Sequence, residues 1–200
     1  LIINRLGKVT KNIEVFAPYL PYARQDRESI KGEAVSADLL CGLLCDGGVR
    51  KLITFDCHFL PRPGVFMRNR LKIENLSAGK ELFKHAKKYF GKEKFIVISP
   101  DQGSSYFIEN ALGKNSPGFA LNKTRERHID HGLETEIHEI VGNADVKGKN
   151  VCILDDIIAT GGTIMHASAH LKKIGAKKVI CGATHGVFAG IDIAKKIRES

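Results

Sequence analysis

The stretch Asp155–Thr163, which reads DDIIATGGT, combines two carboxylates with two adjacent glycines and two threonines. It follows the apolar run Val151–Leu154, so we expect a turn over Asp155–Thr160 that connects a buried strand to a helix. Gly161 and Gly162 let the backbone approach an anion at the first amides of that helix, where parallel sheets bind ligands. Because carboxylates repel an anion, the acids would address sugar hydroxyls or magnesium instead. The pattern therefore favours a phosphorylated-sugar site over a plain acidic turn before a capped helix.

A second segment with chemical potential is Pro18–Arg27, which reads PYLPYARQDR and follows the apolar run Ile13–Ala17. Arg24 can stack on a base or clamp a phosphate, Gln25 can hydrogen-bond a base, and Arg27 adds positive charge. The alternative is a basic surface turn. Two prolines, two tyrosines and this order of charges within ten residues favour a nucleotide site.

These two motifs together resemble the ribose-phosphate pyrophosphokinase family. DDIIATGGT resembles the phosphoribosyl pyrophosphate loop that this family shares with type I phosphoribosyltransferases, and it does not separate the two. Pro18–Arg27 resembles the ATP-binding segment PYxxYARQDR, which favours the pyrophosphokinases. Three more segments resemble family elements in the family's order: Asp56-Cys-His58 (DxH), Ser99–Gly103 (SPDxG) and Lys123-Thr-Arg125 (KxR).

The resemblance implies the reaction of ATP with ribose 5-phosphate to give AMP and phosphoribosyl pyrophosphate, with Mg2+ bridging the phosphates. It implies ATP-binding roles for Arg24, Gln25, Asp26, Arg27 and His58, and magnesium support from His58 and Asp101. It implies that ribose 5-phosphate is bound by Asp101, Asp155, Asp156, Ala159, Thr160, Gly161, Gly162 and Thr163. Lys123 and Arg125 would be the catalytic pair, because two cations on a closing loop stabilise charge during phosphoryl transfer. It also implies a homo-oligomer, at least a dimer.

Two departures from the family pattern keep other functions open. Ala159 stands where many pyrophosphokinases have aspartate, and residues 59–63 (FLPRP) replace the usual glutamine-containing continuation. A non-catalytic regulatory homologue and a phosphoribosyltransferase are therefore alternatives. Judged without the family, His58 is more commonly a packed histidine than a ligand, and Lys123 and Arg125 are ordinary solvated charges.

The elements that must position these residues alternate between two kinds. Buried strands are expected at Ile13–Ala17, Leu52–Phe55, Phe95–Ser99, Val151–Leu154 and Val179–Ala183, and helices at Ser36–Leu44, Ala78–Phe90, Ser104–Leu112 and Thr163–Ile174. Ser36 is a candidate N-cap, and Gly175 lies where a C-capping glycine belongs. The alternation predicts an α/β fold of two phosphoribosyltransferase-like units, each a mainly parallel sheet with helices on both faces.

The regular pattern is interrupted twice. It breaks at Pro61–Gly64 and resumes near Ser77, which suggests an ATP-binding unit at residues 1–75 and a ribose 5-phosphate-binding unit at residues 76–200, both incomplete. Arg125–Thr135 is polar and mixed in charge, and it is typical of a long hairpin arm or mobile loop. Within it, His128 and His131 lack a third ligand and are expected to be solvent-exposed rather than metal-bound.

Composition narrows the classes of partner. The net charge of +9 favours an anionic partner, such as nucleic acid or a polyphosphate substrate, but decides nothing alone. Because the lysine clusters lack interleaved aromatic residues, a nucleic-acid-binding module is the weakest alternative. No apolar run is long enough for a membrane span. The five cysteines form no CxxC pair, which argues against a zinc or disulfide framework and favours a reducing, cytoplasmic setting. Because the sequence starts at Leu1, we expect a fragment.

Overall fold

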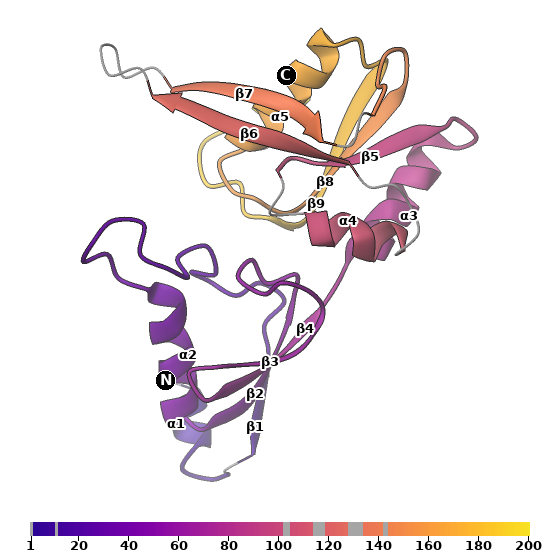
Figure 1. Cartoon of the computed structure of the whole chain (residues 1–200). Coiled ribbons are helices and arrows are strands. Elements are labelled where there is room, and N and C mark those ends of the chain that lie inside the picture. Colours follow the sequence, from indigo (N-terminus) through magenta and orange to yellow (C-terminus); the bar gives the residue numbers. More distant parts are fainter. Residues whose placement is uncertain (1, 11, 102–104, 114–118, 128–133, 142–143) are drawn as a thin grey trace. The chain divides into compact units, whose positions relative to one another are not determined.

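The structure is a computed structural model that describes residues 2–10, 12–101, 105–113, 119–127, 134–141 and 144–200 (Figure 1). It divides into two compact units, Leu1–Ser77 and Ala78–Ser200, which are described separately below. The division falls close to the join expected at residues 75–76. His128 and His131, which were expected to be solvent-exposed, lie outside the described residues.

Unit 1 is a four-stranded sheet with two helices. Its elements are α1 (Ile2–Leu6), β1 (Ile13–Phe16), α2 (Ser36–Asp46), β2 (Val49–Phe55), β3 (Gly64–Arg68) and β4 (Leu71–Leu76). The strand order is β1-β2-β4-β3, in which β1, β2 and β4 are parallel and β3 is an antiparallel edge strand. The three parallel strands therefore end at one common edge of the sheet.

The core of unit 1 lies on one face of this sheet. Leu52, Leu71 and Ile73 are fully buried and cluster with Cys41 of α2. On the opposite face Phe16, Val65 and Met67 are 61%, 58% and 66% exposed. The prediction of helices on both faces is therefore wrong for unit 1 within the part of the chain that is described.

The stretch after Pro61 was expected to be irregular, and this was wrong. It forms the hairpin β3–β4, whose two-residue turn Asn69-Arg70 has φ angles of 47° and 67°. Positive φ at both positions matches the twist of a hairpin, but asparagine and glycine are its usual residues. Because arginine is unusual at the second position of such a turn, the sequence did not indicate a hairpin here.

Unit 2 is a three-layered α/β unit. Its elements are α3 (Gly79–Phe90), β5 (Phe95–Ser99), α4 (Ser105–Leu112), β6 (Phe119–Arg127), β7 (Glu134–Val141), β8 (Asn150–Ile158), α5 (Gly162–Lys173), β9 (Lys178–Gly186) and α6 (Ile193–Glu199). The strand order is β7-β6-β5-β8-β9, with only the β6–β7 pair antiparallel. This pair is the hairpin expected around Arg125–Thr135.

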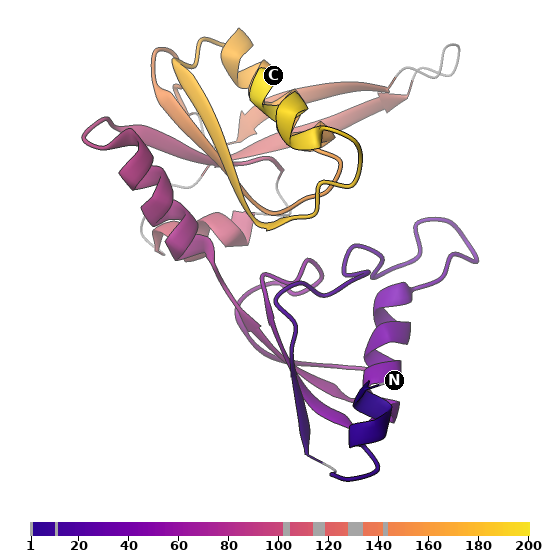
Figure 2. The same cartoon turned by 180° about the vertical axis from the view of Figure 1, so that it is seen from behind.

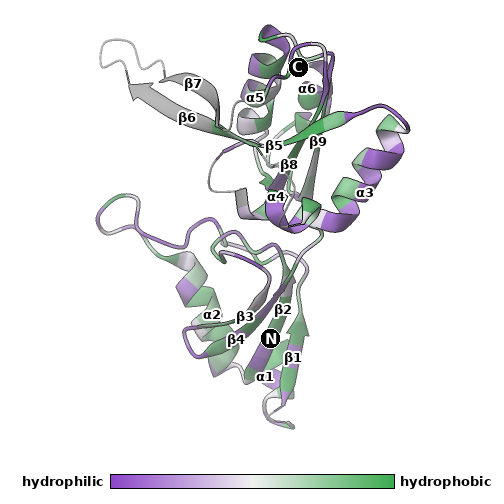
Figure 3. Cartoon of the chain, turned by 45° about the vertical axis from the view of Figure 1, so that its right-hand side comes forward, coloured by the Kyte–Doolittle hydropathy of each residue, from purple (hydrophilic) through white to green (hydrophobic). Residues whose placement is uncertain are grey.

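The sheet of unit 2 has helices on both faces, as predicted (Figures 1 and 2). Phe107 of α4 packs with Phe90 of α3 over one face, while Ile164 and Leu171 of α5 pack over the other. Strand β5 is apolar along its length (Figure 3), because buried parallel strands are covered on both sides. None of the described helices in either unit is long and apolar enough to cross a membrane.

Three local predictions can be judged at the element ends. Strand β8 is buried throughout and continues through Asp155 to Ile158, so the turn expected over Asp155–Thr160 was placed too early. The predicted N-cap was also wrong: α2 begins at Ser36, and the Ser36 hydroxyl donates to Gln25 Oε1 (2.8 Å) instead. The C-cap prediction is confirmed, since Gly175 (φ +96°) donates to the Lys172 carbonyl (3.0 Å) after α5 ends.

Candidate functional site

The carboxyl edge of the unit 1 sheet brings two of the predicted segments together. The Phe55 amide at the end of β2 donates to the Pro18 carbonyl (3.1 Å), and so does the Thr54 hydroxyl (3.2 Å). Asp56 N donates to the carbonyl of Leu76 at the end of β4 (2.8 Å). The turns that follow β1 and β2 are therefore neighbours, as the order of parallel strands requires.

Within the segment Arg24–Arg27 the four side chains differ in exposure. Arg24 and Arg27 are exposed, so their guanidinium groups face solvent and can meet an anion. Gln25 and Asp26 are half-buried. The Gln25 amide is engaged at both ends, since Nε2 donates to Glu33 Oε1 (3.2 Å) and Oε1 accepts from Ser36. Gln25 thus holds the following loop against the start of α2.

Glu33 is the anchor of that loop. Its second carboxylate oxygen accepts the Ser29 backbone N–H at 2.9 Å. This hydrogen bond, followed by the one from Gln25, lowers the pKa of Glu33 because both favour the ionised form. The Glu33 carboxylate therefore connects the Gln25 side chain with the backbone at Ser29, two residues after Arg27.

The turn after β2 carries an unusual backbone. Asp56 is 1% exposed and has φ +36°, while His58 two residues later is exposed. Buried Asn75 supports the turn from β4: its Oδ1 accepts the Cys57 N–H (2.9 Å) and its Nδ2 donates to the Arg62 carbonyl (3.0 Å). The Asn75 side-chain amide thus takes over where the backbone pairing of β2 and β4 ends, and the His58 side chain is exposed to solvent.

Arg68 is a residue that the sequence did not point to. From β3 it forms an ion pair with Asp38 of α2, donates to the Asp26 carbonyl (2.8 Å) and lies over the Phe59 ring (4.2 Å to the centroid). No local pattern reveals such a residue, because its partners are 9 to 42 positions away in the chain. Only the folded hairpin brings them together.

In unit 2 the predicted carboxylates lie close to the carboxyl ends of two adjacent parallel strands, with Asp101 after β5 and Asp155 and Asp156 within β8. Ile98 of β5 pairs with Ile153 of β8, so Asp101 and Asp155 both follow within three residues of that level. Asp155 and Asp156 are 7% and 3% exposed, and Asp155 Oδ1 accepts the Asp156 N–H (2.9 Å). The Asp101 carbonyl accepts the Ser99 hydroxyl, while Gly103 of the same motif is not among the described residues.

The turn after β8 is short and glycine-dependent. It contains half-buried Ala159, exposed Thr160 and buried Gly161, whose φ is +80°. Gly161 precedes α5 and its carbonyl accepts the Met165 N–H (2.9 Å), so the first amides of the helix begin here. Gly162 and Thr163 occupy the first turn of α5.

The far side of this turn is braced by the segment before α6. Ala189 N donates to the Ala159 carbonyl (2.9 Å) and Val187 N donates to the Ile158 carbonyl (3.0 Å). A β-carbon added to Gly161 would lie 3.0 Å from Ile193 and 3.1 Å from Ile197, both of α6. The turn therefore has little freedom to change conformation.

Lys123 and Arg125 lie on β6 of the hairpin. Ala120 pairs with Ser99, so the backbone of Lys123 is three residues, or ~10 Å, beyond the end of β5. Across the hairpin Lys123 is opposite His138, and Arg125 is opposite Glu136. The register places both backbone positions on the carboxyl side of the sheet, the side that also carries Asp101 and Asp155.

The described residues contain no group of three or more histidine, cysteine, aspartate or glutamate side chains that could hold a metal ion by themselves. Magnesium is commonly held by one or two carboxylates together with substrate phosphates and water. Asp101, which follows β5, could supply a carboxylate for that mode of binding. The donor set present therefore suits a magnesium ion that arrives with a phosphorylated substrate.

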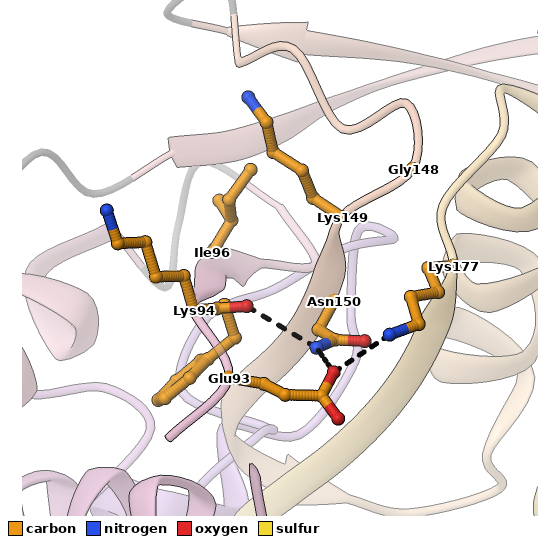
Figure 4. Close-up of a pocket in the computed structure, with 8 residues that line it drawn as sticks. Glu93, Lys94, Ile96, Gly148, Lys149, Asn150 and Lys177 are labelled. Atoms are coloured by element: carbon orange, nitrogen blue, oxygen red, sulfur yellow. Dashed lines mark hydrogen bonds and ion pairs between the residues drawn. The ribbon is translucent and has the colours of Figure 1, made fainter. Parts of the chain in front are cut away.

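A cavity of about 550 Å³ lies at the opposite, amino edge of the unit 2 sheet (Figure 4). Its walls carry Lys94, Lys149 and an ion pair between Glu93 and Lys177 (2.9 Å), and Asn150 Nδ2 donates to the same glutamate (2.8 Å). None of the predicted site residues lines it. The hydrogen bonds from Asn150 and Lys177 lower the pKa of Glu93, because they favour its ionised form. The Glu93 carboxylate, which precedes β5, thus connects the starts of β8 and β9.

Comparison with known proteins places these motifs in context. The model of the phosphoribosyl transferase domain family matches residues 70–196. A ribose-phosphate pyrophosphokinase of Corynebacterium glutamicum is 35% identical over 193 residues, and one of Pyrococcus furiosus is 36% identical over 183 residues. The crystal structure of the phosphoribosylpyrophosphate synthetase from Mycobacterium smegmatis superposes with a TM-score of 0.80 at 30% identity and covers 99% of this chain.

The relatives are longer than this chain. The matches cover 94% and 90% of this chain but only 57% and 60% of the Corynebacterium and Pyrococcus enzymes, and 62% of the Mycobacterium synthetase. The likeness thus extends over nearly all of this sequence and over about three fifths of each relative.

Proposed function

The chain belongs to the phosphoribosyl transferase domain family, and from that premise we propose that it serves as a ribose-phosphate pyrophosphokinase. The reaction is the transfer of a diphosphoryl group from ATP to ribose 5-phosphate, which yields AMP and phosphoribosyl pyrophosphate. The observation that carries the proposal is that one chain has both the DDIIATGGT turn and the Arg24–Arg27 turn at carboxyl edges of parallel sheets. A phosphoribosyltransferase needs only the first of these.

Unit 2 takes the acceptor in this proposal. The amides at the start of α5, with Thr160 and Thr163, receive the 5-phosphate beside Gly161 and Gly162, because helix N-termini favour anions. Asp155 and Asp156 accept hydrogen bonds from the ribose hydroxyls. Ala159 contributes its backbone rather than a carboxylate, and its carbonyl is already bonded to Ala189.

Unit 1 takes ATP. Arg24 and Arg27 are the exposed cations that contact the triphosphate or stack on the base, and exposed His58 lies on the neighbouring turn. Gln25 and Asp26 fix the shape of the segment: the Gln25 side chain donates to Glu33, and the Asp26 carbonyl accepts from Arg68. Gln25 therefore acts on ATP through the loop that it holds, unless its amide exchanges partners on binding.

Catalysis is a matter of positioning and of charge neutralisation. The anomeric hydroxyl of ribose 5-phosphate attacks the β-phosphorus of ATP, the bond to the α-phosphate oxygen breaks, and AMP departs. Lys123 and Arg125 on the hairpin stabilise the charge that develops on the transferred group. His58 in unit 1 and Asp101 in unit 2 would each serve as a magnesium ligand, and magnesium bound with the substrate phosphates would supply further neutralisation of their charge. We further propose a homo-oligomer, at least a dimer, acting in the cytoplasm on ATP and ribose 5-phosphate.

The test is mass spectrometry of a reaction that contains the full-length gene product, ATP, ribose 5-phosphate and magnesium. The expected products are AMP and phosphoribosyl pyrophosphate in equal amounts. Release of pyrophosphate from phosphoribosyl pyrophosphate that depends on an added nucleobase would instead establish a phosphoribosyltransferase. ATP binding without any product would establish the regulatory homologue, the second candidate, which the replacement at Ala159 favours.

A further inference from the structure

The hairpin β3–β4 is connected to both turns that carry the candidate ATP-binding residues. Arg68, at the end of β3, has a side chain that is 21% exposed and touches three different elements. Nε pairs with Asp38 of α2, and Nη2 donates to the Asp26 carbonyl at 2.8 Å. The guanidinium plane lies over the Phe59 ring, with 4.2 Å between its central carbon and the ring centroid.

These contacts connect two turns at Asp26 and Phe59, which belong to no strand or helix. Asp26 belongs to the turn after β1, and Phe59 directly follows His58 in the turn after β2. An arginine can serve both because its planar fork presents several donors in fixed directions and its face stacks on an aromatic ring. Lysine has one compact cationic group and does not reproduce this combination.

The hairpin itself is fixed to α2, so that Arg68 is a rigid support. Asn69 Nδ2 donates to the Asp38 carbonyl (2.7 Å), and Arg70 Nη2 pairs with Asp46 Oδ1 (2.9 Å). The first attachment lies directly beside Arg68, and the second lies at the far end of the helix. Arg70 and Asp46 are 76% and 66% exposed, so their ion pair adds little to this attachment, and the Asn69 hydrogen bond beside Arg68 carries it.

We propose that Arg68 is a positioning residue for ATP: it sets the distance between the Arg24–Arg27 segment and His58 without touching the nucleotide. The inference rests on the proposed function, because it takes those two turns as the ATP site. Removing the Arg68 side chain leaves the ATP-binding side chains unchanged. It removes the contacts that hold the turns at Asp26 and Phe59, so the backbone there is less restrained. ATP must then order both turns on binding, which lowers its affinity.

The experiment compares Arg68→Met, Arg68→Lys and the matched control Arg70→Met, which loses a cation from the same hairpin without any contact to either turn. Dissociation constants for ATP and for ribose 5-phosphate are measured by calorimetry with magnesium present. We expect Arg68→Met to weaken ATP about tenfold, or ~1.4 kcal/mol, with ribose 5-phosphate unchanged. Arg68→Lys should recover part of the loss, and Arg70→Met should match the wild type.

A second readout separates positioning from general stability. Hydrogen exchange of the amides at residues 24–27 and 57–60 should accelerate in Arg68→Met and not in Arg70→Met. If Arg68→Met does not fold, Arg68→Lys is compared with Arg70→Met on the same two readouts, with a loss of about threefold in ATP affinity expected. Unchanged ATP affinity, or an equal loss for both substrates, overturns the role of Arg68. A wild-type protein that does not bind ATP overturns the proposed function instead.

Discussion

Gly161 and Gly162 are neighbours where the turn after β8 meets α5, yet the structure gives them opposite tolerance to a side chain. Gly161 has φ +80°, where an L-residue is strained by about 1–2 kcal/mol. Its added β-carbon would lie 3.0 Å from Ile193 and 3.1 Å from Ile197, and crowding of this kind costs about 1 kcal/mol when side-chain ends can shift. Alanine also restricts the unfolded chain, which offsets about 0.5–1 kcal/mol. Gly161→Ala should therefore lower the free energy of unfolding by ~1–2.5 kcal/mol.

Gly162→Ala is the matched control. Gly162 is the first residue of α5, and the nearest atom to an added β-carbon is Thr160 Oγ1 at 3.9 Å. Alanine is the better helix former by about 0.5–1 kcal/mol, so this variant should be as stable as the wild type or slightly more so. The pair differs by one position and by nothing else in side-chain chemistry.

The assay is urea unfolding followed by circular dichroism, with separate transitions fitted if the two units unfold independently. Calorimetry with ribose 5-phosphate then reports on the turn itself, and Gly161→Ala should bind it more weakly because the amides of the turn are displaced. Equal stability of the two variants would refute the reasoning from backbone conformation. A destabilised Gly161→Ala with full ribose 5-phosphate affinity would refute the assignment of the turn.

Three further predictions concern single residues. Lys123→Ala should reduce turnover far more than ribose 5-phosphate affinity, which steady-state kinetics and calorimetry together measure; unchanged turnover would remove Lys123 from catalysis. Glu93→Gln should lower stability at neutral pH, because Asn150 and Lys177 lower the pKa of Glu93 from 4.5 and favour its ionised form in the fold. That difference is fully present above pH 4.5 and shrinks as the pH falls through the lowered pKa, so unfolding curves across this range should converge toward acid. Burial raises the pKa of Cys152 to about 12, so at pH 8 iodoacetamide should modify partly exposed Cys45 well before Cys152, as peptide mass spectrometry would show.

The sequence predicted the elements that are long and strongly periodic. Strand Phe95–Ser99 agrees with β5 at both ends, and helix Ala78–Phe90 agrees with α3 to within one residue, because burial on both faces or along one stripe leaves a clear pattern. The hairpin β3–β4 was missed because its turn has arginine where glycine is usual. Helix α6 was missed because seven residues carry too little periodicity.

The predicted site residues were found by motif, and their supports were not. Arg24, His58 and Asp101 lie in the segments that follow β1, β2 and β5, and Asp155 lies in the second half of β8. All four are on the carboxyl side of their sheet, where chemistry in parallel sheets is expected. Arg68 and Asn75 hold these turns through contacts between residues far apart in the chain. A single sequence contains no local signal for such contacts. The division is physical: ligand-binding groups cluster along the chain at turns, whereas supporting groups are brought in by tertiary structure.

Because β8 continues through Asp155 and Asp156, the carboxylates and the glycines of this segment lie in different elements. This separation explains how one segment could bind both the hydroxyls and the phosphate of one sugar. Asp155 pairs with Ala183 of β9, and the strand runs on through buried Ile157 and Ile158 before the turn begins. The carboxylates are therefore fixed in the sheet, and the glycines lie several residues beyond them, where the backbone changes to helix. Had the turn started at Asp155, the acids would share a flexible loop with the anion and repel it at short range. The strand keeps the negative charges apart from the helix N-terminus, so that hydroxyls and a phosphate of one sugar can be bound by separate parts of the same segment.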